Sequence, residues 1–378
     1  MAPTEILARQ HYENLAPLFA RFGLPCALLT GSTPVRERRA ILAGLQSGDI
    51  TLCIGTHALL TADVQYARLG LVITDEQHRF GVEQRSALSH KGAAPHTLVL
   101  SATPIPRTLA LIIYGDLDVS VIDELPPGRQ PIRTVHYTDA ARLRLFGFMR
   151  QEIKKGRQIY VVYPLIKESE TMDYKDLQDG YEAISRDFPL PEYVTTICHG
   201  KMKPEDKEES MRQFKSGEAN IMVATSVIEV GVDVPNATVM VIESAERFGL
   251  SQLHQLRGRV GRGSQQSYCI LMSGEKLSKE ARLRLEAMCE TNDGFRLAEL
   301  DLKLRGAGDV NGTLQSGMAF DLKIANPTLD SQILTVTREA AAEVLTADPT
   351  LTQNGHEGLR ELRKRYSGRE EIDFSQIS

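Results

Sequence analysis

The sequence predicts an α/β fold with two parallel-sheet lobes and a helical C-terminal extension. Three observations lead to this prediction. One block of sequence occurs twice, short apolar runs alternate with amphipathic stretches, and charged, helix-favouring sequence begins near residue 276. Apolar strands that alternate with helices are typical of a parallel sheet covered on both faces.

The duplication sets the domain organisation. Residues 31–56 align without a gap with residues 200–225, and residues 71–81 repeat at 239–249, one residue out of step. Only two copies occur, which indicates a duplicated domain and not a solenoid. The matched positions include Gly31 with Gly200, Gly48 with Gly217, Ile54 with Val223 and Thr56 with Thr225.

Each copy is predicted to form a strand, a turn, a helix that a glycine ends, and further strands. Pro34 stands where the first turn of a helix tolerates proline, and Gly48 stands where that helix ends. Pro204 and Gly217 take the same places in the second copy. The predicted strands are 27–29, 52–54, 69–74 and 97–100 in the first lobe, and 196–198, 221–223 and 239–242 in the second.

Two further features divide the chain. Three prolines and a glycine between residues 124 and 131 predict a connector. Ser278 is a predicted N-cap for a helix that reaches Thr291, Asn326-Pro327 opens a helix through Val344, and residues 360–369 form a charged, peripheral end. The predicted domains are lobe 1 at 1–124, a linker at 125–131, lobe 2 at 132–275 and the helical extension at 276–378.

Composition narrows the class of protein. The net charge of −5 does not by itself indicate a nucleic-acid binder, so any such contact must come from local arginines and lysines. The five cysteines are scattered and form no C-x-x-C pair, which argues against zinc and a disulfide framework. The chain has neither a signal peptide nor a run of about 18 apolar residues. We therefore expect a cytoplasmic protein that does not cross a membrane.

Two carboxylates are the first candidates for catalysis. Asp75 and Glu76 follow the apolar run Leu-Val-Ile-Thr, and parallel sheets bind ligands beyond the carboxyl ends of their strands. In nucleotide hydrolases the first carboxylate holds Mg²⁺ and the second polarises the attacking water. The pair therefore predicts a site for ATP and Mg²⁺. An isolated acidic pair is more often an ordinary turn, but its neighbours count against that interpretation.

Those neighbours predict coupling between the site and the position of the lobes. Gln77 and His78 follow the carboxylates directly, and Ser101-Ala-Thr103 follows the next predicted strand. The hydroxyl groups of Ser101 and Thr103 can bond His78 or the carboxylates, which would link site occupancy to lobe position.

The second lobe contributes arginines and a strand end. Arg257, Arg259 and Arg262 lie among two glycines, and guanidinium groups pair with phosphate oxygens. An arginine from a second lobe stabilises the charge that develops during phosphoryl transfer. Four residues near the end of the strand at 221–223 complete this prediction: Thr225 and Ser226 for a nucleic-acid phosphate, Gly231 and Asp233 for the nucleotide cleft.

These motifs together resemble a known family. The ordered set DEQH, SAT, TSVIEVGVD and QLRGRVGR resembles superfamily 2 helicases, and DEQHRFGVEQR, SATPIPRTLAL and LHQLRGRVGRG resemble the RecG helicases. Residues 294–317, with GFRLAE, DLKLRGAG and GTLQSG, resemble the helical-hairpin motif that RecG shares with the Mfd translocases. The similarity extends to about residue 345.

The resemblance implies RecA-like lobes that use ATP and Mg²⁺ to move along double-stranded DNA, regressing stalled forks and migrating branched junctions. By position, Asp75 would bind Mg²⁺, Glu76 would be the catalytic base, and Arg259 and Arg262 would be arginine fingers. Contacts to the DNA backbone are implied for Pro3, Thr4, Gly55, Thr56, His57 and Thr225. Arg305 and Gln315 would belong to the hairpin that converts lobe closure into DNA movement. A monomer and a single-stranded DNA-binding protein as partner complete these expectations.

One part of the family pattern is missing. The family's N-terminal wedge domain and its G-x-x-x-x-G-K-[ST] loop have no counterpart, and the only Gly-Lys pair, Gly200-Lys201, is followed by Met202. We therefore expect a partial copy whose first lobe is truncated at its N-terminus. Such a copy cannot hydrolyse ATP alone, and its first lobe exposes apolar edges. Two alternatives stay open: an Mfd-type translocase, which usually differs at Gln77-His78, and a non-hydrolysing DNA-binding module. A PriA-type helicase would require zinc-binding cysteine pairs.

Overall fold

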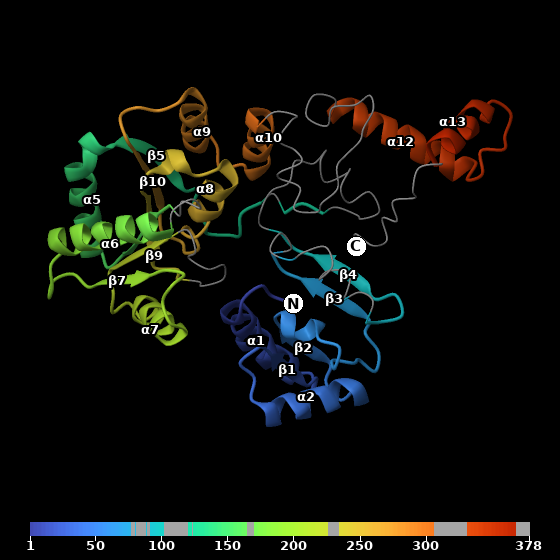
Figure 1. The fold of residues 1–378 in the computed structure, drawn as a ribbon, viewed down its shortest axis with the longest axis horizontal. Helices are drawn as coiled ribbons and strands as arrows, with labels where there is room; N and C mark the ends of the chain where they lie inside the picture. The colour runs from blue at the N-terminus through green and yellow to red at the C-terminus, as the bar shows by residue number, and fades with distance from the viewer. Residues whose placement is uncertain are drawn as a thin grey trace.

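The computed structural model confirms an α/β protein with a parallel sheet and a helical C-terminal region (Figure 1). The structure describes residues 1–76, 80, 88, 91–101, 120–122, 124–164, 170–225, 234–305 and 331–367. No helix among these residues is long and apolar enough to cross a membrane.

Lobe 2 is built on a six-stranded sheet in which every described pair of neighbours is parallel. Helices separate its strands along the chain, as the sequence predicts, except between β8 and β9, where none is described. In spatial order the strands are β5 (Arg133–Thr138), β10 (Tyr268–Ser273), β9 (Ala237–Ile242), β6 (Gln158–Tyr163), β8 (Ile221–Thr225) and β7 (Thr195–Cys198).

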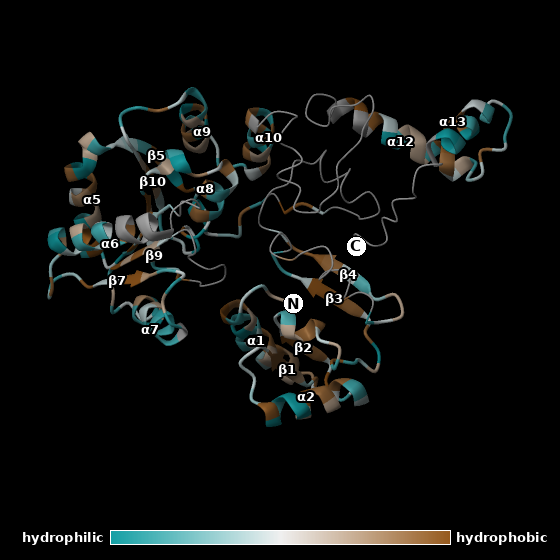
Figure 2. Cartoon of the chain, viewed as in Figure 1, coloured by the Kyte–Doolittle hydropathy of each residue, from teal (hydrophilic) through white to brown (hydrophobic). Residues whose placement is uncertain are grey.

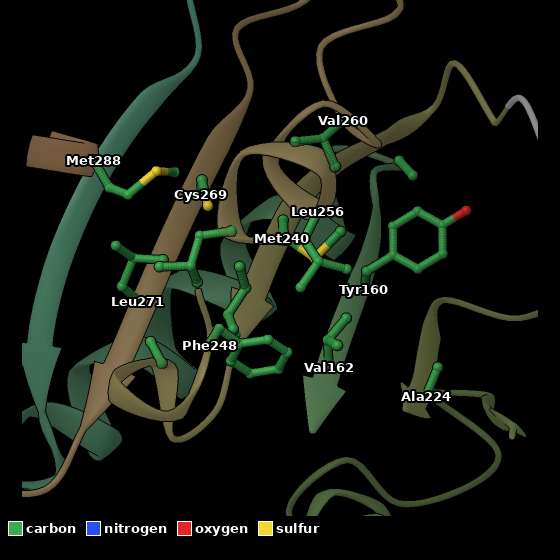
Figure 3. Close-up of a cluster of buried hydrophobic side chains, with 14 of the residues drawn as sticks. Tyr160, Val162, Ala224, Met240, Phe248, Leu256, Val260, Cys269, Leu271 and Met288 are labelled. Atoms are coloured by element: carbon green, nitrogen blue, oxygen red, sulfur yellow. The ribbon is translucent and has the colours of Figure 1, made fainter. Parts of the chain in front are cut away.

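Helices cover both faces of this sheet. Along β6, Tyr160 and Val162 enter one apolar core while Ile159 and Val161 enter the other, because side chains alternate between the faces of a strand. Figure 3 shows part of the first core, to which α8 contributes Leu256. The first face is covered by α7 (Pro204–Lys215), α8 (Leu250–Arg257) and α9 (Lys279–Glu290), and the second by α5 (Arg142–Lys154) and α6 (Glu170–Asp187).

Lobe 1 contains two small parallel sheets that the first residues of the chain join. The sheets are β1 (Cys26–Leu29) with β2 (Leu52–Gly55), and β3 (Leu71–Thr74) with β4 (His96–Val99). Met1 donates to Ile73 O over 2.6 Å and accepts from Asp75 N over 3.0 Å, while Ala2 N donates to Gly55 O over 2.8 Å. The backbone of Met1 and Ala2 therefore lies between β2 and β3, as a strand would.

Two helices and an apolar strip complete the described part of lobe 1. Helix α1 (Glu5–Ala20) packs against β1 and β2, and α2 (Val35–Ser47) packs against β1. Strand β3 and the second half of β4 are brown, and so apolar, in Figure 2. Their exposed apolar side chains, with the one that follows β4, are Leu71, Ile73, Leu98 and Leu100.

The structure confirms the duplication down to strand register. Cys26 pairs with Leu52 between β1 and β2, and the aligned residues Thr195 and Ile221 pair between β7 and β8. The glycines that follow the two helices share a left-handed backbone, with φ of 86° at Gly48 and 82° at Gly217. Glycine adopts this conformation without the steric cost that a Cβ brings, which explains its place in both copies.

The described part of the C-terminal region consists of helices joined by short turns and irregular segments. Ser278 caps α9 as predicted, because its Oγ accepts from Ala281 N over 3.1 Å. The helix predicted to end at Val344 continues three residues further. It ends there because proline disfavours the helical conformation at the residue before it, and the next residue precedes Pro349. Its predicted start at Asn326 lies outside the described residues. The remaining helices are α10 (Gly294–Arg305), α12 (Ser331–Ala347) and α13 (Glu357–Ser367).

Candidate active site

Three short segments meet at the carboxyl edge of the lobe 1 sheet. They are the Met1–Thr4 segment, the Gly55–His57 segment at the end of β2, and Asp75-Glu76 after β3. The hydrogen bonds from Ala2 to Gly55 and from Asp75 to Met1 hold them together. Ser101 reaches the same edge, because Leu100 N donates to Thr74 O over 2.8 Å. The predicted catalytic carboxylates and several predicted DNA contacts are therefore neighbours.

Asp75 is a half-buried carboxylate held by a histidine. Its Oδ2 accepts a hydrogen bond from His11 Nε2 over 2.9 Å, and its side chain is 25% exposed. This hydrogen bond is the main cause that lowers the pKa of Asp75 below its ordinary value. The carboxylate is thus ionised at neutral pH, as a metal ligand must be.

The sequence interpretation missed His11. A signal for it exists, because His11 follows the buried residues Leu7 and Ala8 at helical spacings of four and three. Residues at these spacings share one face of a helix. Helix α1 packs this face against β1 and β2, and His11 on it reaches Asp75, which directly follows β3.

Glu76 has a backbone conformation that few side chains adopt. It is 9% exposed and has φ of 53°. Left-handed backbone at a residue other than glycine stores strain and is concentrated at functional sites. Ser244, which aligns with Glu76 in the duplicated stretch, has φ of 47° in lobe 2. The turn that follows the carboxylate strand is therefore a shared feature of the two copies.

The donor set at this edge suits Mg²⁺ that arrives with a nucleotide. Among the residues described, no group of three or more histidine, cysteine or acidic side chains is arranged as a metal site. Mg²⁺ in nucleotide sites uses one or two carboxylates and takes its other ligands from phosphates and water. The ionised Asp75 fits this role.

Two aligned threonines end aligned strands with buried hydroxyl groups. Thr56 and Thr225 are each 2% exposed, and neither Oγ1 has a hydrogen-bond partner among the described residues. A buried hydroxyl without a partner costs free energy. Both groups are predicted DNA contacts, but since they are covered here, a phosphate could reach them only after a local movement.

The other predicted DNA contacts of lobe 1 have local structural roles. Thr4 caps α1, where its Oγ1 accepts from Leu7 N over 3.3 Å. At Gly55 a Cβ would collide with the backbone oxygen of Leu29, so only glycine fits. His57 begins a short 3₁₀ turn (His57–Leu60), and Pro3 precedes the cap. Their contacts with DNA stay predictions.

The arginine segment of lobe 2 follows α8 and is anchored at its centre. Val260 is 2% exposed and lies in the apolar core between Arg259 and Arg262 (Figure 3). Gly261 has φ of 79°, and a Cβ there would lie 2.8 Å from Ile132 Cγ1. The buried valine and the glycine fix the path of the backbone that carries both arginines.

Arg257 corrects one of the sequence interpretations. Its sequence context predicts a phosphate-binding arginine, but in the structure its side chain is 2% exposed and turned inward. Its Nη1 donates to Met288 O and Thr291 O over 2.8 Å each, and its Nη2 donates to His254 Nδ1 over 3.0 Å. It therefore joins the end of α8 to the end of α9.

Several predicted site residues cannot be placed, and their roles stay predictions. The side chain of Arg305, the last residue of α10, is not among those described. The residues outside the described part of the chain are Gln77, His78, Thr103, Ser226, Gly231, Asp233 and Gln315.

Three family models match the chain. Residues 1–112 match DEAD/DEAH box helicases, and residues 142–264 match the helicase conserved C-terminal domain. Residues 291–378 match the C-terminal part of domain 3 of the ATP-dependent DNA helicase RecG.

Curated relatives and a solved structure have the same name. The ATP-dependent DNA helicase RecG of Synechocystis sp. is 51% identical over 97% of this chain and 44% of its own length. That of Bacillus subtilis is 48% identical over 92% of this chain and 51% of its own length. A structure of RecG bound to a three-way DNA junction is 45% identical, with a TM-score of 0.68, over 88% of this chain and 43% of that one. The chain spans about half the length of the relatives it matches.

Proposed function

Because the chain is homologous to the RecG helicases over nearly its whole length, we propose that it forms the motor part of an ATP-dependent helicase that remodels branched DNA. Fork regression and branch migration of junctions are the proposed reactions. The Mfd alternative is not favoured, since the matching relatives and the C-terminal family model are those of RecG.

One observation carries the proposal. The ionised carboxylate of Asp75 and the strained Glu76 lie at the same sheet edge as the Met1–Thr4 and Gly55–His57 segments. In a translocase, the residues that hydrolyse the nucleotide must lie close to the residues that bind the DNA backbone, so that one event can move the other. This edge supplies the carboxylates, the peptide groups and the hydroxyl groups for both.

The residues take complementary roles in this proposal. Asp75 would hold Mg²⁺, which when bound neutralises the charge of the nucleotide phosphates. Glu76 would polarise the attacking water, and Arg259 and Arg262 would stabilise the charge on the transferred phosphoryl group. The contacts that the sequence predicts for other residues with the nucleotide and with DNA, and the predicted role of the hairpin, are part of the same proposal.

Four further points are proposed with it; the first three rest on the resemblance, and the last rests on the composition of the chain. They are Mg²⁺ as the metal, a monomeric state, a single-stranded DNA-binding protein as partner, and the cytoplasm as location.

DNA binding by the 378-residue chain tests the proposal directly. Fluorescence anisotropy with a labelled three-way junction and with a linear duplex of equal length measures the affinity at several salt concentrations. Lysine and arginine contacts to phosphates release counterions, so the affinity should fall by at least about tenfold between 50 and 200 mM salt. Failure to bind either DNA at the lowest salt concentration would contradict the proposed function.

A further inference from the structure

Helix α1 joins two functional parts of lobe 1. At its start, Thr4 caps the first turn, and Glu5 accepts hydrogen bonds from the backbone and hydroxyl of Ser32 over 3.1 and 2.6 Å. Two turns further on, His11 holds Asp75. At 1.5 Å per residue, Thr4 and His11 are about 10 Å apart along the helix axis. One rigid element thus connects the Pro3–Thr4 segment with the carboxylate.

Asp75 is tied to this element by two independent bonds. Its backbone N donates to Met1 O over 3.0 Å, just before the helix, and its Oδ2 accepts from His11 on the helix. The carboxylate also accepts from the backbone of the next residue, Glu76, but these two bonds are the ones that join Asp75 to α1 and to the segment that leads into it. Any movement of the Pro3–Thr4 segment must either carry Asp75 along or break these bonds.

We propose that His11 is a positioning residue, which holds the Asp75 carboxylate for the divalent cation and makes α1 a mechanical link between the DNA-contacting segment and that carboxylate. The inference rests on the proposed function, since it takes Asp75 as the metal ligand. It adds His11 to the residues of the site, and it adds a connection through α1 by which DNA contact at the start of the helix sets the orientation of the carboxylate. Removal of a group that orients a metal ligand typically lowers the metal affinity 10- to 100-fold.

The chain offers a matched control for this pair. His356 Nδ1 bonds Asp348 Oδ2 over 2.9 Å, the same distance as between His11 and Asp75. This second pair closes the turn between α12 and α13, away from the segments that meet at the lobe 1 edge. It is likewise a histidine–aspartate pair, but no residue of α1 takes part in it.

The first experiment follows the histidine ring signals of the chain by NMR with ¹³C-labelled histidine. His11→Gln assigns the His11 signal, and Asp75→Asn should shift it while the His356 signal stays. Addition of three-way junction DNA should then shift the His11 signal and leave that of His356 unchanged. Binding of DNA that leaves the His11 signal in place would overturn the link. Failure of DNA to bind at all would instead count against the proposed function.

The second experiment separates positioning from a purely structural role. The chain is joined to a segment that supplies a phosphate-binding loop, and ATP hydrolysis is measured against Mg²⁺ concentration. His11→Ala should raise the Mg²⁺ concentration for half-maximal rate about tenfold or more. His11→Gln should keep the Mg²⁺ concentration for half-maximal rate close to that of the unsubstituted chain, since the glutamine amide N–H can donate to the carboxylate. Equal effects of the two substitutions, or an unchanged Mg²⁺ requirement, would overturn the positioning role.

Discussion

Thr56 and Thr225 occupy equivalent positions in the two lobes, and each buries a hydroxyl group that has no partner among the described residues. Folding alone does not account for such a group, because an isosteric apolar side chain would avoid its desolvation cost. Thr195 and Thr238 also bury such hydroxyl groups, so the prediction of a ligand contact rests on the equivalent positions of Thr56 and Thr225 at the strand ends. The predicted ligand is the DNA backbone.

Replacement of each threonine by valine separates folding from binding. Thr56→Val and Thr225→Val remove only the hydroxyl group, so neither should lower the free energy of unfolding measured with urea. Each should weaken binding to the three-way junction by about 10- to 150-fold, since a hydrogen bond to a charged group contributes about 1.5 to 3 kcal/mol.

Thr30 provides the matched control at the same scale. It is 3% exposed, but its Oγ1 lies 3.1 Å from Ser32 Oγ, within hydrogen-bond distance. Thr30→Val should therefore lower the free energy of unfolding by about 1 kcal/mol. A loss of stability in the Thr56 and Thr225 variants as large as in this control would contradict the interpretation.

Among the elements, α8 and α9 are joined by one buried side chain. Arg257 bonds two carbonyl oxygens near the end of α9 and the ring of His254. The last carbonyl groups of a helix have no partner within it, so this guanidinium acts as a cap for α9. It also fixes the end of α8, from which the segment with Arg259 and Arg262 continues.

Arg257→Met should destabilise the chain by about 2 to 4 kcal/mol, because it leaves buried carbonyl oxygens unpaired. Urea unfolding measures this change. Arg212→Ala is the control: Arg212 pairs with Glu209 and Glu218 at an exposed position, and exposed ion pairs contribute little. Similar losses in the two variants would mean that the Arg257 contacts do not cap α9.

The pH dependence of stability reports on the same network. Burial, and then the charge of Arg257, lowers the pKa of His254 from 6.5 to about 4. Between these values the unfolded chain binds a proton at this residue that the folded chain does not. The contribution of His254 to the free energy of unfolding is therefore fully present above pH 6.5. It decreases as the pH drops toward 4, by about 1.4 kcal/mol per pH unit.

His254→Gln tests this prediction, since glutamine can still accept from Arg257 but does not titrate. Urea unfolding of both chains between pH 4 and 7 should show a flatter dependence in the variant, by close to one proton. Identical slopes would show that His254 is not kept neutral by the fold.

For the whole molecule, the central prediction concerns ATP. The 378-residue chain contains no G-x-x-x-x-G-K-[ST] loop, and the lysine and hydroxyl of that loop supply most contacts to the β- and γ-phosphates. We expect no DNA-stimulated ATP hydrolysis by this chain alone in a phosphate-release assay. Turnover that Glu76→Gln abolishes would contradict this expectation.

When a phosphate-binding loop is supplied on an added segment, the two lobes should act together. Arg262→Ala is then expected to leave ATP binding largely intact and to lower the rate of hydrolysis by about 1,000-fold or more. Rapid hydrolysis by this variant would contradict the arginine-finger role. Equilibrium binding of a fluorescent ATP analogue separates the two effects.

Local patterns in the sequence were sufficient for the two-lobe α/β organisation, the duplication, the cap at Ser278 and the helix ends at Gly48 and Gly217. Strand pattern, turn residues and caps act over a few residues, so their physical effects can be read without the fold. The motifs around Asp75, Glu76 and residues 255–262 were identified for the same reason, since each is contiguous in the chain.

Only the tertiary structure decided which side chains these motifs meet. His11 and Asp75 are 64 residues apart, and Arg257 and Met288 are 31 apart, so no local pattern links them. Arg257 has the sequence context of a phosphate ligand, but packing turns it into the core. The left-handed backbone of Glu76 and the covered hydroxyl groups of Thr56 and Thr225 likewise follow from how the strand ends are packed. Contacts between distant residues depend on the position of whole elements, and that position is fixed by the core.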